Sequence, residues 1–276
     1  MEEEEWARKS MLGVVTGVSY VSGIDYFRGI NEHVSALWKR EKMPTRTMEK
    51  NARMVMACVD CDIYVNHLEA GEHEKCAEYL FMDGVKRVHA GGADILVIAS
   101  NTAHIVCPLV ASRLPAMRVL HIADCIAMRC RELGVTYAGL LGTKPTMEAV
   151  ETDEKNGWLK ARLKAHGIKV AVPERAEDRR RCYDIICHEL SFGEMKAESR
   201  NFFSALGDDL CRAQGVQAII LGCTEIELLL SRDSMQDSDI RAPLLRSAEI
   251  HIECAAKAQL GLLCIDDIEP QASSPR

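Results

Sequence analysis

Short apolar runs alternate with longer amphipathic segments along the chain, and this alternation constrains the fold more than any other feature. Parallel strands that are covered by helices on both faces read as near-continuous apolar runs. Strands that alternate with helices form right-handed βαβ units, so we predict an α/β protein with mostly parallel sheets. The predicted strands are residues 11–16, 53–58, 94–99, 117–121, 135–141, 168–172 and 217–221, and the predicted helices include 23–40, 72–91, 145–166, 196–214 and 247–260.

Charge and composition argue against several classes of partner. The net charge is −7, so no general attraction to nucleic acid or to an anionic membrane is expected. The basic run 179–181 follows acidic residues and is interpreted as a solvated helical face. The longest apolar runs, such as 95–99 and 218–221, are too short to cross a bilayer. The acidic start, Glu2 to Glu5, is unlike a secretory signal, and the predicted location is cytoplasmic.

The chain contains 12 cysteines, which suit a reducing compartment where most are small buried hydrophobes. Cys58 and Cys61 form a C-x-x-C pair. A zinc site needs two further ligands, and the sequence has no second C-x-x-C. No metal site is therefore predicted.

Residues 92–102 and 215–225 resemble each other. In both, a glycine stands eight positions before a Ser or Cys, a hydrophobic strand follows the glycine, and polar residues then open a helix. The two segments suggest two similar half-structures. The alternative is that any α/β protein repeats a strand–turn–helix unit.

Cys223 is placed where a strand ends and a helix begins, which is the edge of an α/β sheet where ligands bind. The positive end of a helix lowers the pKa of a thiol, so Cys223 is predicted to be a reactive base or nucleophile. Gly222 before it allows close approach of a ligand, and Thr224 after it adds a hydroxyl. The alternative is a buried cysteine without a chemical role.

Ser100 occupies the matching position in the first copy. Asn101 and Thr102 offer donors to a carboxylate, and His104 lies four residues after Ser100, on the same side of a helix. The competing interpretation is a helix-capping cluster, with His104 bonded to a neighbouring carbonyl. In a third turn, Thr143 or Thr146 is expected to cap the next helix or to bind a carboxylate.

These motifs resemble those of the aspartate/glutamate racemase superfamily, in order, over roughly residues 11–262. Residues 100–104 read S-N-T-A-H where the family has C-N-T-x-H, and residues 221–225 read L-G-C-T-E as in the family. Residues 142–148 resemble its G-T-x-x-T-M element. Gly17 and Ser19, with the segment 25–32, are similar to its opening glycine turn and first helix.

The resemblance implies two Rossmann-like α/β lobes with parallel sheets, related by a pseudo-twofold, and an active site in the cleft between them. The N-terminal lobe is expected to comprise residues 1–120 and 243–276, with a returning C-terminal helix, and the C-terminal lobe residues 121–242. The resemblance also implies catalysis without pyridoxal phosphate. No cofactor is predicted, since the sequence lacks nucleotide-binding and zinc motifs.

In the racemases that this chain resembles, two cysteines flank the α-carbon of the substrate. One thiolate removes the α-proton and the other thiol returns a proton to the opposite face. Cys223 matches the acid/base of the C-terminal lobe, and Ser100 and His104 are the candidates on the other side. The expected substrate contacts are Ser19, Arg53, Asn101, Thr102, Thr143, Thr146, Thr224 and Glu225.

Two departures from the family pattern matter. Ser100 stands where the family has its first cysteine, and a hydroxyl is a far weaker acid than a thiol. Ser191, two residues before Gly193, stands where aspartate-specific members have lysine, which argues against aspartate as the substrate. Arg53, ahead of the second strand, is then the candidate to meet an acidic side chain.

The leading prediction is a cofactor-independent amino-acid racemase or epimerase that deprotonates the L-substrate better than the D-substrate. A one-thiol decarboxylase of substituted malonates is the alternative within enzymes. A degenerate member that binds an amino acid or scaffolds a partner is the non-enzymatic alternative. The expected ligand is an amino acid or related carboxylic acid, and a homodimer is possible.

Overall fold

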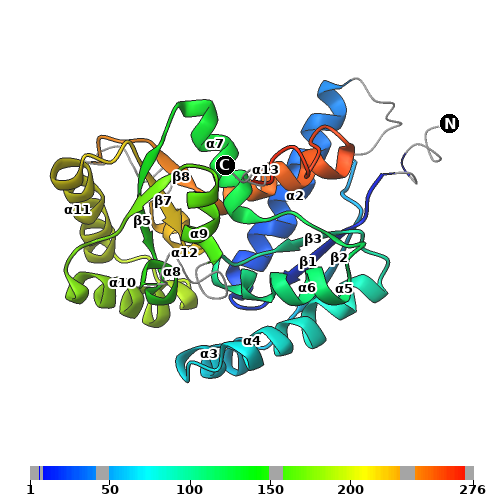
Figure 1. Ribbon diagram of the computed structural model, residues 1–276, viewed down its shortest axis with the longest axis horizontal. Coiled ribbons are helices and arrows are strands. Elements are labelled where there is room, and N and C mark those ends of the chain that lie inside the picture. The colour runs from blue at the N-terminus through cyan, green and yellow to red at the C-terminus, as the bar shows by residue number, and fades with distance from the viewer. Residues whose placement is uncertain (1–5, 7–8, 42–49, 149–157, 231–239, 271–276) are drawn as a thin grey trace, which may run out of the picture. The chain divides into compact units, whose positions relative to one another are not determined.

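The computed structural model describes residues 6, 9–41, 50–148, 158–230 and 240–270. The chain divides into two compact units, one formed by residues 1–121 and 251–269 and the other by residues 122–250 and 270–276. In each unit, helices cover a four-stranded sheet (Figure 1). The two units are described separately below.

The sheet of the first unit has the strand order β2-β1-β3-β4, and all of its pairings are parallel. Leu12 at the start of the central strand β1 is level with Met54 and Ile95 on its neighbours. Its strands are β1 (Leu12–Thr16), β2 (Met54–Cys58), β3 (Ile95–Ile98) and β4 (Arg118–Val119). Its helical segments are α2 (Tyr20–Arg40), α3 (Cys61–Glu69), α4 (His73–Tyr79), the π-helix η1 (Leu80–Val85), α5 (Lys86–Ala90), the 3₁₀ turn η2 (Thr102–Val106) and α6 (Cys107–Arg113).

The sheet of the second unit has the strand order β6-β5-β7-β8 and is also parallel throughout. Its strands are β5 (Tyr137–Gly142), β6 (Lys169–Ala171), β7 (Ala218–Gly222) and β8 (Leu244–Arg246). Its helical segments are α7 (Ile122–Leu133), α8 (Lys144–Glu148), α9 (Trp158–Ala165), α10 (Ala176–His188), the 3₁₀ turn η3 (Leu190–Phe192), α11 (Ala197–Gln214) and α12 (Thr224–Leu229). Helix α13 (Ser247–Leu260) begins in this unit, and from His251 onward it belongs to the first.

Both sheets place their strands in the same chain order, with the second and first strands at one side and the third and fourth at the other. The two similar sequence segments form β3 and β7, which hold equivalent positions in their sheets. The prediction of an α/β fold with two parallel sheets is therefore confirmed.

One predicted unit boundary and one predicted helix differ from the structure. The chain passes from the second unit to the first at 250/251 and not at 242/243, because the short strand β8 pairs with β7. The predicted helix 72–91 is interrupted by η1 where Gly84 packs against Val15 of β1. The predicted helix 145–166 is present as α8 and α9, and residues 149–157 lie outside the described residues.

Polar contacts of His251 and Gln259 attach α13 to the first unit. The Nε2–H of His251 donates to the carbonyl of Leu120 (2.8 Å), so its Nδ1 accepts from the hydroxyl of Tyr26 (2.8 Å). Gln259 donates to the carbonyls of Ser10 and Arg53. The resemblance implied a returning C-terminal helix, and these hydrogen bonds connect α13 with β1 and its neighbours.

Gly17 directly follows β1, and it tests how tightly this unit is packed. Its φ is +102°, and an added Cβ would collide with the Val59 backbone. Gly92 provides a matched control, because its φ is +88° but nothing lies within 4 Å of an added Cβ. We expect Gly92→Ala to cost about 1 kcal/mol in free energy of unfolding, and Gly17→Ala about 1–3 kcal/mol more, because the core must also shift. Urea denaturation measures both, and equal costs would contradict this packing.

Candidate functional site

In the first unit, polar side chains gather where β1 and β3 end. Thr16 is the last residue of β1, and Ser19 is the N-cap of α2. Ser100 to Thr102 follow β3, which pairs with β1. Because parallel strands bring their carboxyl ends to one edge, these residues share the edge of the sheet where ligands bind in α/β proteins.

The Ser100 turn is held together by its own hydrogen bonds. The Ser100 Oγ accepts from the Ala103 N–H (3.4 Å) and lies 3.4 Å from the Thr102 Oγ1. Ser100, Asn101 and Thr102 are all buried. The turn therefore caps η2, as the competing interpretation predicted, and it also brings three polar side chains to the sheet edge.

His104 contacts the backbone of this turn. Its Nδ1 donates to the carbonyl oxygen of Ser100 (2.8 Å), a contact with the main chain and not with the hydroxyl. Its ring centroid lies 4.4 Å from that of His121 and 5.9 Å from that of His251, and all three rings are buried. This bond gives His104 a role in holding the turn, and its place as an acid/base candidate beside Ser100 stays a prediction.

The amino-terminal end of α2 has features that suit the binding of an anion. This helix has 21 residues, no acidic side chain in its first turn and no side-chain hydrogen bond from its N-cap, Ser19. The Oγ of Ser19 and the Oγ1 of Thr16 are buried without a hydrogen-bond partner among the described residues. Open N–H groups at a long helix start, with two hydroxyls beside them, suit a carboxylate.

Two residues in this region escaped the sequence analysis. Thr16 was overlooked, although a polar residue that ends an apolar strand before a glycine turn is a usable signal. Tyr64 of α3 is 1% exposed, and its phenol lies near Thr102 without making a hydrogen bond to it. Burial raises the pKa of Tyr64, and the nearby Thr102 only partly offsets this, so the phenol stays protonated. Nothing in the local sequence marks Tyr64.

In the second unit, Cys223, Thr224 and Glu225 follow β7 and are each less than 10% exposed. The Sγ of Cys223 donates to the Oε2 of Glu225 (2.9 Å), and the Thr224 hydroxyl donates to the same oxygen (2.8 Å). One carboxylate oxygen thus accepts from both the thiol and the hydroxyl. This is the most concentrated group of chemically active side chains at the carboxyl edge of this sheet.

The prediction of a lowered thiol pKa is wrong for this environment. Burial, followed by the negative charge of Glu225, raises the pKa of Cys223 well above its ordinary value. The helix that was expected to lower it, α12, has only six residues. The nearby Cys187 of α10 raises the pKa of Cys223 further.

Thr143 and Thr146 lie at the start of α8, close to the end of β5. Their hydroxyls are 2.8 Å apart, and the Thr146 N–H donates to the Thr143 Oγ1 (3.4 Å). This is the capping arrangement, and it also places both hydroxyls at the same sheet edge as Cys223, because β5 and β7 are adjacent parallel strands.

Arg53 is not at the site. It precedes β2 and so lies at the amino end of the strand, opposite to the edge that carries Ser100. Its Nη1 donates to the carbonyls of Trp6 and Lys9 (3.1 and 2.6 Å). The predicted contact with a substrate side chain is therefore withdrawn. Ser191 donates to the carbonyl of Ile186 (2.8 Å) and so closes the end of α10.

The two cysteines of the C-x-x-C pair lie at the end of a strand and the start of the next helix. Cys58 ends β2, and Cys61 begins α3, where its Sγ contacts the carbonyl of Val18 (2.9 Å). Across the described parts of the chain, no group of three or more His, Cys, Asp or Glu side chains is arranged to hold a metal ion. No described helix is long and apolar enough to cross a membrane.

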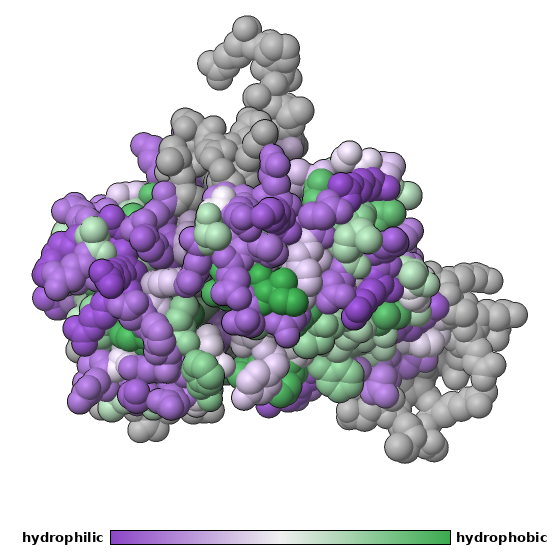
Figure 2. All heavy atoms as spheres, turned by 90° about the horizontal axis from the view of Figure 1, so that it is seen from below, coloured by the Kyte–Doolittle hydropathy of each residue, from purple (hydrophilic) through white to green (hydrophobic). Residues whose placement is uncertain are grey.

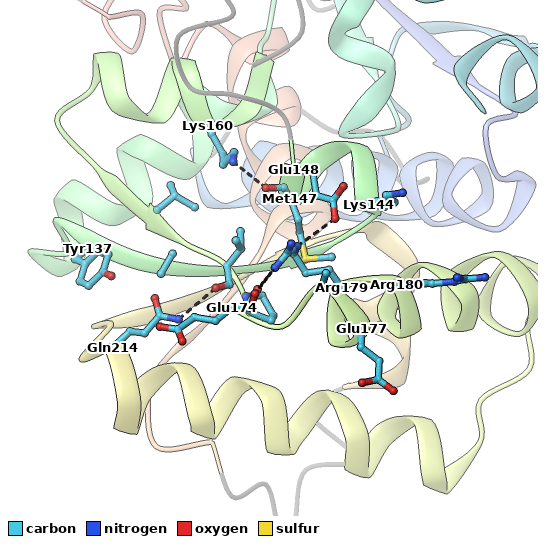
Figure 3. A pocket seen from close by; sticks show the side chains of 15 residues that line it. Tyr137, Lys144, Met147, Glu148, Lys160, Glu174, Glu177, Arg179, Arg180 and Gln214 are labelled. Carbon is cyan, nitrogen blue, oxygen red and sulfur yellow. Dashed lines mark hydrogen bonds and ion pairs between the residues drawn. The ribbon is translucent and has the colours of Figure 1, made fainter. Parts of the chain in front are cut away.

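A hollow of about 1210 Å³ on the second unit lies beside α8, β6 and α10 (Figure 3). Arg179 points into it, is 18% exposed and pairs with Glu148, and it donates to the carbonyls of Pro173 and Glu174. The basic run is thus partly internal and not wholly a solvated face. None of the predicted site residues lines this hollow, so we assign it no function.

The surface is mainly hydrophilic on the face drawn in Figure 2, with hydrophobic areas between the polar ones. Helix α2 exposes Tyr20, Ile24 and Phe27, which are 61%, 57% and 55% accessible. Their spacing places them on one side of the helix. The predicted homodimer stays a prediction.

The comparisons with known proteins agree with this arrangement. The family model for Asp/Glu/Hydantoin racemases matches residues 15–255. This chain belongs to that family. A Yersinia pestis protein assigned as an Asp/Glu racemase shares 32% identity, with a TM-score of 0.73 and coverage of 91% of this chain and 99% of that chain.

More distant structures show the same fold. An aspartate racemase homologue from Pyrococcus horikoshii has 23% identity and a TM-score of 0.64, with coverage of 92% of this chain and 98% of that one. Glutamate racemase from Francisella tularensis in complex with D-glutamate has 13% identity and a TM-score of 0.59, with coverage of 97% and 85%. The resemblance to the aspartate/glutamate racemases that the sequence motifs indicated is confirmed by the family match.

The environment of Cys223 predicts how its thiol reacts. At pH 7 we expect iodoacetamide to label the exposed Cys58, Cys61 and Cys264 before Cys223, because the raised pKa of Cys223 leaves little thiolate. Its labelling rate should rise steeply as the solution becomes alkaline. Peptide mass spectrometry resolves the four sites in one sample. Early labelling of Cys223 at neutral pH would contradict the raised pKa.

Proposed function

We propose that this member of the Asp/Glu/Hydantoin racemase family is an amino-acid racemase in which Cys223 removes the α-proton. The observation that carries the proposal is the Cys223–Thr224–Glu225 group, buried at the carboxyl edge of its sheet. A thiol in that position, with a carboxylate to accept its proton, is equipped for acid–base chemistry at carbon.

The first half-reaction is a proton transfer. The Cys223 thiolate takes the α-proton, the S–H bond forms, and the electron pair of the C–H bond remains on the substrate as a carbanion conjugated with its carboxyl group. Donors at the substrate carboxylate stabilise the negative charge that develops there. Thr143, Thr146 and Thr224 in the second unit, with Ser19, Asn101 and Thr102 in the first, are the proposed contacts. The orphaned hydroxyls of Thr16 and Ser19 support a carboxylate near α2.

The second half-reaction is reprotonation from the Ser100 side. The Ala103 N–H donates to the Ser100 Oγ, so the hydroxyl proton is left to point elsewhere. A hydroxyl delivers a proton to a carbanion, directly or by passing one from water, but it is a poor base for the reverse step. The proposed enzyme therefore deprotonates the L-substrate more readily than the D-substrate.

The proposal extends to the setting of the reaction. The substrate is an amino acid or related carboxylic acid, the protein acts in the cytoplasm, and no cofactor takes part. A malonate decarboxylase also works with a single thiol, and Ser100 in place of the first cysteine favours that alternative. Carbon dioxide release from substituted malonates, without exchange of α-protons in amino acids, would identify it.

Loss of the thiol tests the proposal directly. We expect Cys223→Ser to reduce α-proton exchange of L-amino acids in heavy water by about 10²–10⁴-fold, because a hydroxyl is a much weaker base. NMR of a panel of L- and D-amino acids measures the loss of the α-proton signal. Cys187→Ser is the matched control, since it removes a nearby thiol. Normal exchange by Cys223→Ser would refute the mechanism.

Restoring the second thiol tests the one-sided chemistry. Ser100→Cys should raise turnover of the D-substrate, because it supplies a thiol where the family has one. In the wild-type protein the L-substrate should gain deuterium faster than D-product forms. Chiral chromatography combined with mass spectrometry separates isotope exchange from inversion. Equal exchange of both enantiomers by the wild type would contradict the proposed bias.

A further inference from the structure

The Cys223 thiol is buried beside a carboxylate, and this creates a difficulty for the mechanism above. A base must lose its own proton before it can take one from the substrate. Solvent has little access to a side chain that is 7% exposed. The first proton acceptor for the thiol must therefore lie within the protein, and the Glu225 Oε2, 2.9 Å from the Sγ, is in place for that role.

We propose that Glu225 is a positioning residue that holds the proton of Cys223, so that the two side chains share one proton and together act as the base. The inference rests on the proposed function. In the transfer, the proton leaves the Cys223 sulfur and binds the Glu225 Oε2, so that an S–H bond breaks and an O–H bond forms. The pair keeps a single negative charge, which moves from oxygen to sulfur.

The Thr224 hydroxyl can keep its hydrogen bond to Glu225 whether the shared proton is on sulfur or on oxygen. Its hydroxyl donates to the same Oε2 (2.8 Å). When Glu225 is ionised, Oε2 accepts from both the thiol and the hydroxyl. When Glu225 holds the proton, Oε2 donates to the thiolate and still accepts from Thr224. The hydrogen bonds are thus conserved in both states, and little rearrangement is needed for the transfer.

The shared proton also determines how many protons Cys223 and Glu225 carry at each stage of the reaction. After the thiolate takes the α-proton, Cys223 is a thiol and Glu225 is a carboxylic acid, so the pair is neutral and holds two protons. One proton must pass to solvent, after the product has left, before the next turnover. Glu225 therefore controls whether the base is available, and not merely where the thiol points.

Other charged or titratable groups near this pair come from the packed elements around it. They are Cys187 of α10, which raises the pKa of Cys223, and Glu227, two residues beyond Glu225 on α12. Glu227 is engaged at the start of α13, where it accepts from the Ser247 hydroxyl and from the Ala248 and Glu249 N–H groups. Glu227 is on the same helix as Glu225, but its carboxylate binds the start of α13 and not the thiol. The Glu227→Gln variant is therefore a matched control for Glu225→Gln.

The test measures the alkylation of Cys223 by iodoacetamide between pH 5 and 11, without substrate. Interacting groups titrate in two macroscopic steps. The wild type should show a low plateau of reactivity near neutral pH and a second rise in alkali. Glu225→Gln should show one step, with slower alkylation than the wild type at pH 6 and faster alkylation at pH 9. Glu227→Gln should keep two steps, and exposed Cys264 serves as an internal reference for the reagent.

Exchange of α-protons in heavy water provides the second readout. Glu225→Gln should lose about 100-fold at neutral pH, as for the loss of one acid–base group, and should recover part of that loss in alkali, where the thiol ionises by itself. Circular dichroism and the urea midpoint establish that the variant is folded, and Glu225→Asp restores a carboxyl if it is not.

The outcomes separate the two proposals. A single-step alkylation profile in the wild type, with the same midpoint in Glu225→Gln, would overturn the shared proton. Two-step alkylation in a wild type that never exchanges α-protons would refute the racemase proposal and leave the shared proton standing. A pH-independent loss of exchange in folded Glu225→Gln would show a merely structural role and would also overturn the inference.

Discussion

Burial of parallel strands on both faces is the constraint on which the rest of the molecule depends. The strands β1, β3 and β7 are fully buried, so their side chains are apolar, except for Thr16 at the end of β1, and their backbone groups are satisfied by neighbouring strands. Nothing polar can be placed along their length without cost. Chemistry is therefore confined to the residues that follow each strand, and the parallel arrangement brings these residues to one edge of each sheet.

The same burial decides the electrostatics at that edge. Cys223 and Glu225 are removed from water, so a charge on either depends on nearby protein groups, which include the other side chain and the Thr224 hydroxyl. A helix of six residues offers little opposing field, whereas a carboxylate 2.9 Å away has a strong effect on a thiol. The resulting thiol is a weak acid when considered alone. In the proposed mechanism it becomes a useful base only in combination with the carboxylate, so a motif of Cys, Thr and Glu is more informative than the cysteine alone.

The sequence predicts much of the fold because apolar runs of five or more residues are unambiguous when both faces of a strand are buried. It misses β8 because only Leu244 and Leu245 of that strand are apolar, between Pro243 and Arg246. Ser100, Thr143 and Cys223 are predictable because they follow strands. Arg53 is misplaced because a residue before a strand lies at the opposite edge, and Tyr64 is found only in three dimensions. The pKa of Cys223 was predicted with the wrong sign because burial depends on packing that the sequence pattern does not describe.

The two units share a strand order but differ in the chemistry that follows equivalent strands. After β3 the chain supplies uncharged hydroxyls, those of Ser100 and Thr102, and neither gains or loses a proton readily near neutral pH. After β7 it supplies a thiol and a carboxylate that together hold one exchangeable proton. Duplication of the fold therefore did not duplicate the base. Ser100 holds its turn by accepting the Ala103 N–H, and in the proposed mechanism a hydroxyl in this position, where the family has a thiol, removes one direction of proton transfer.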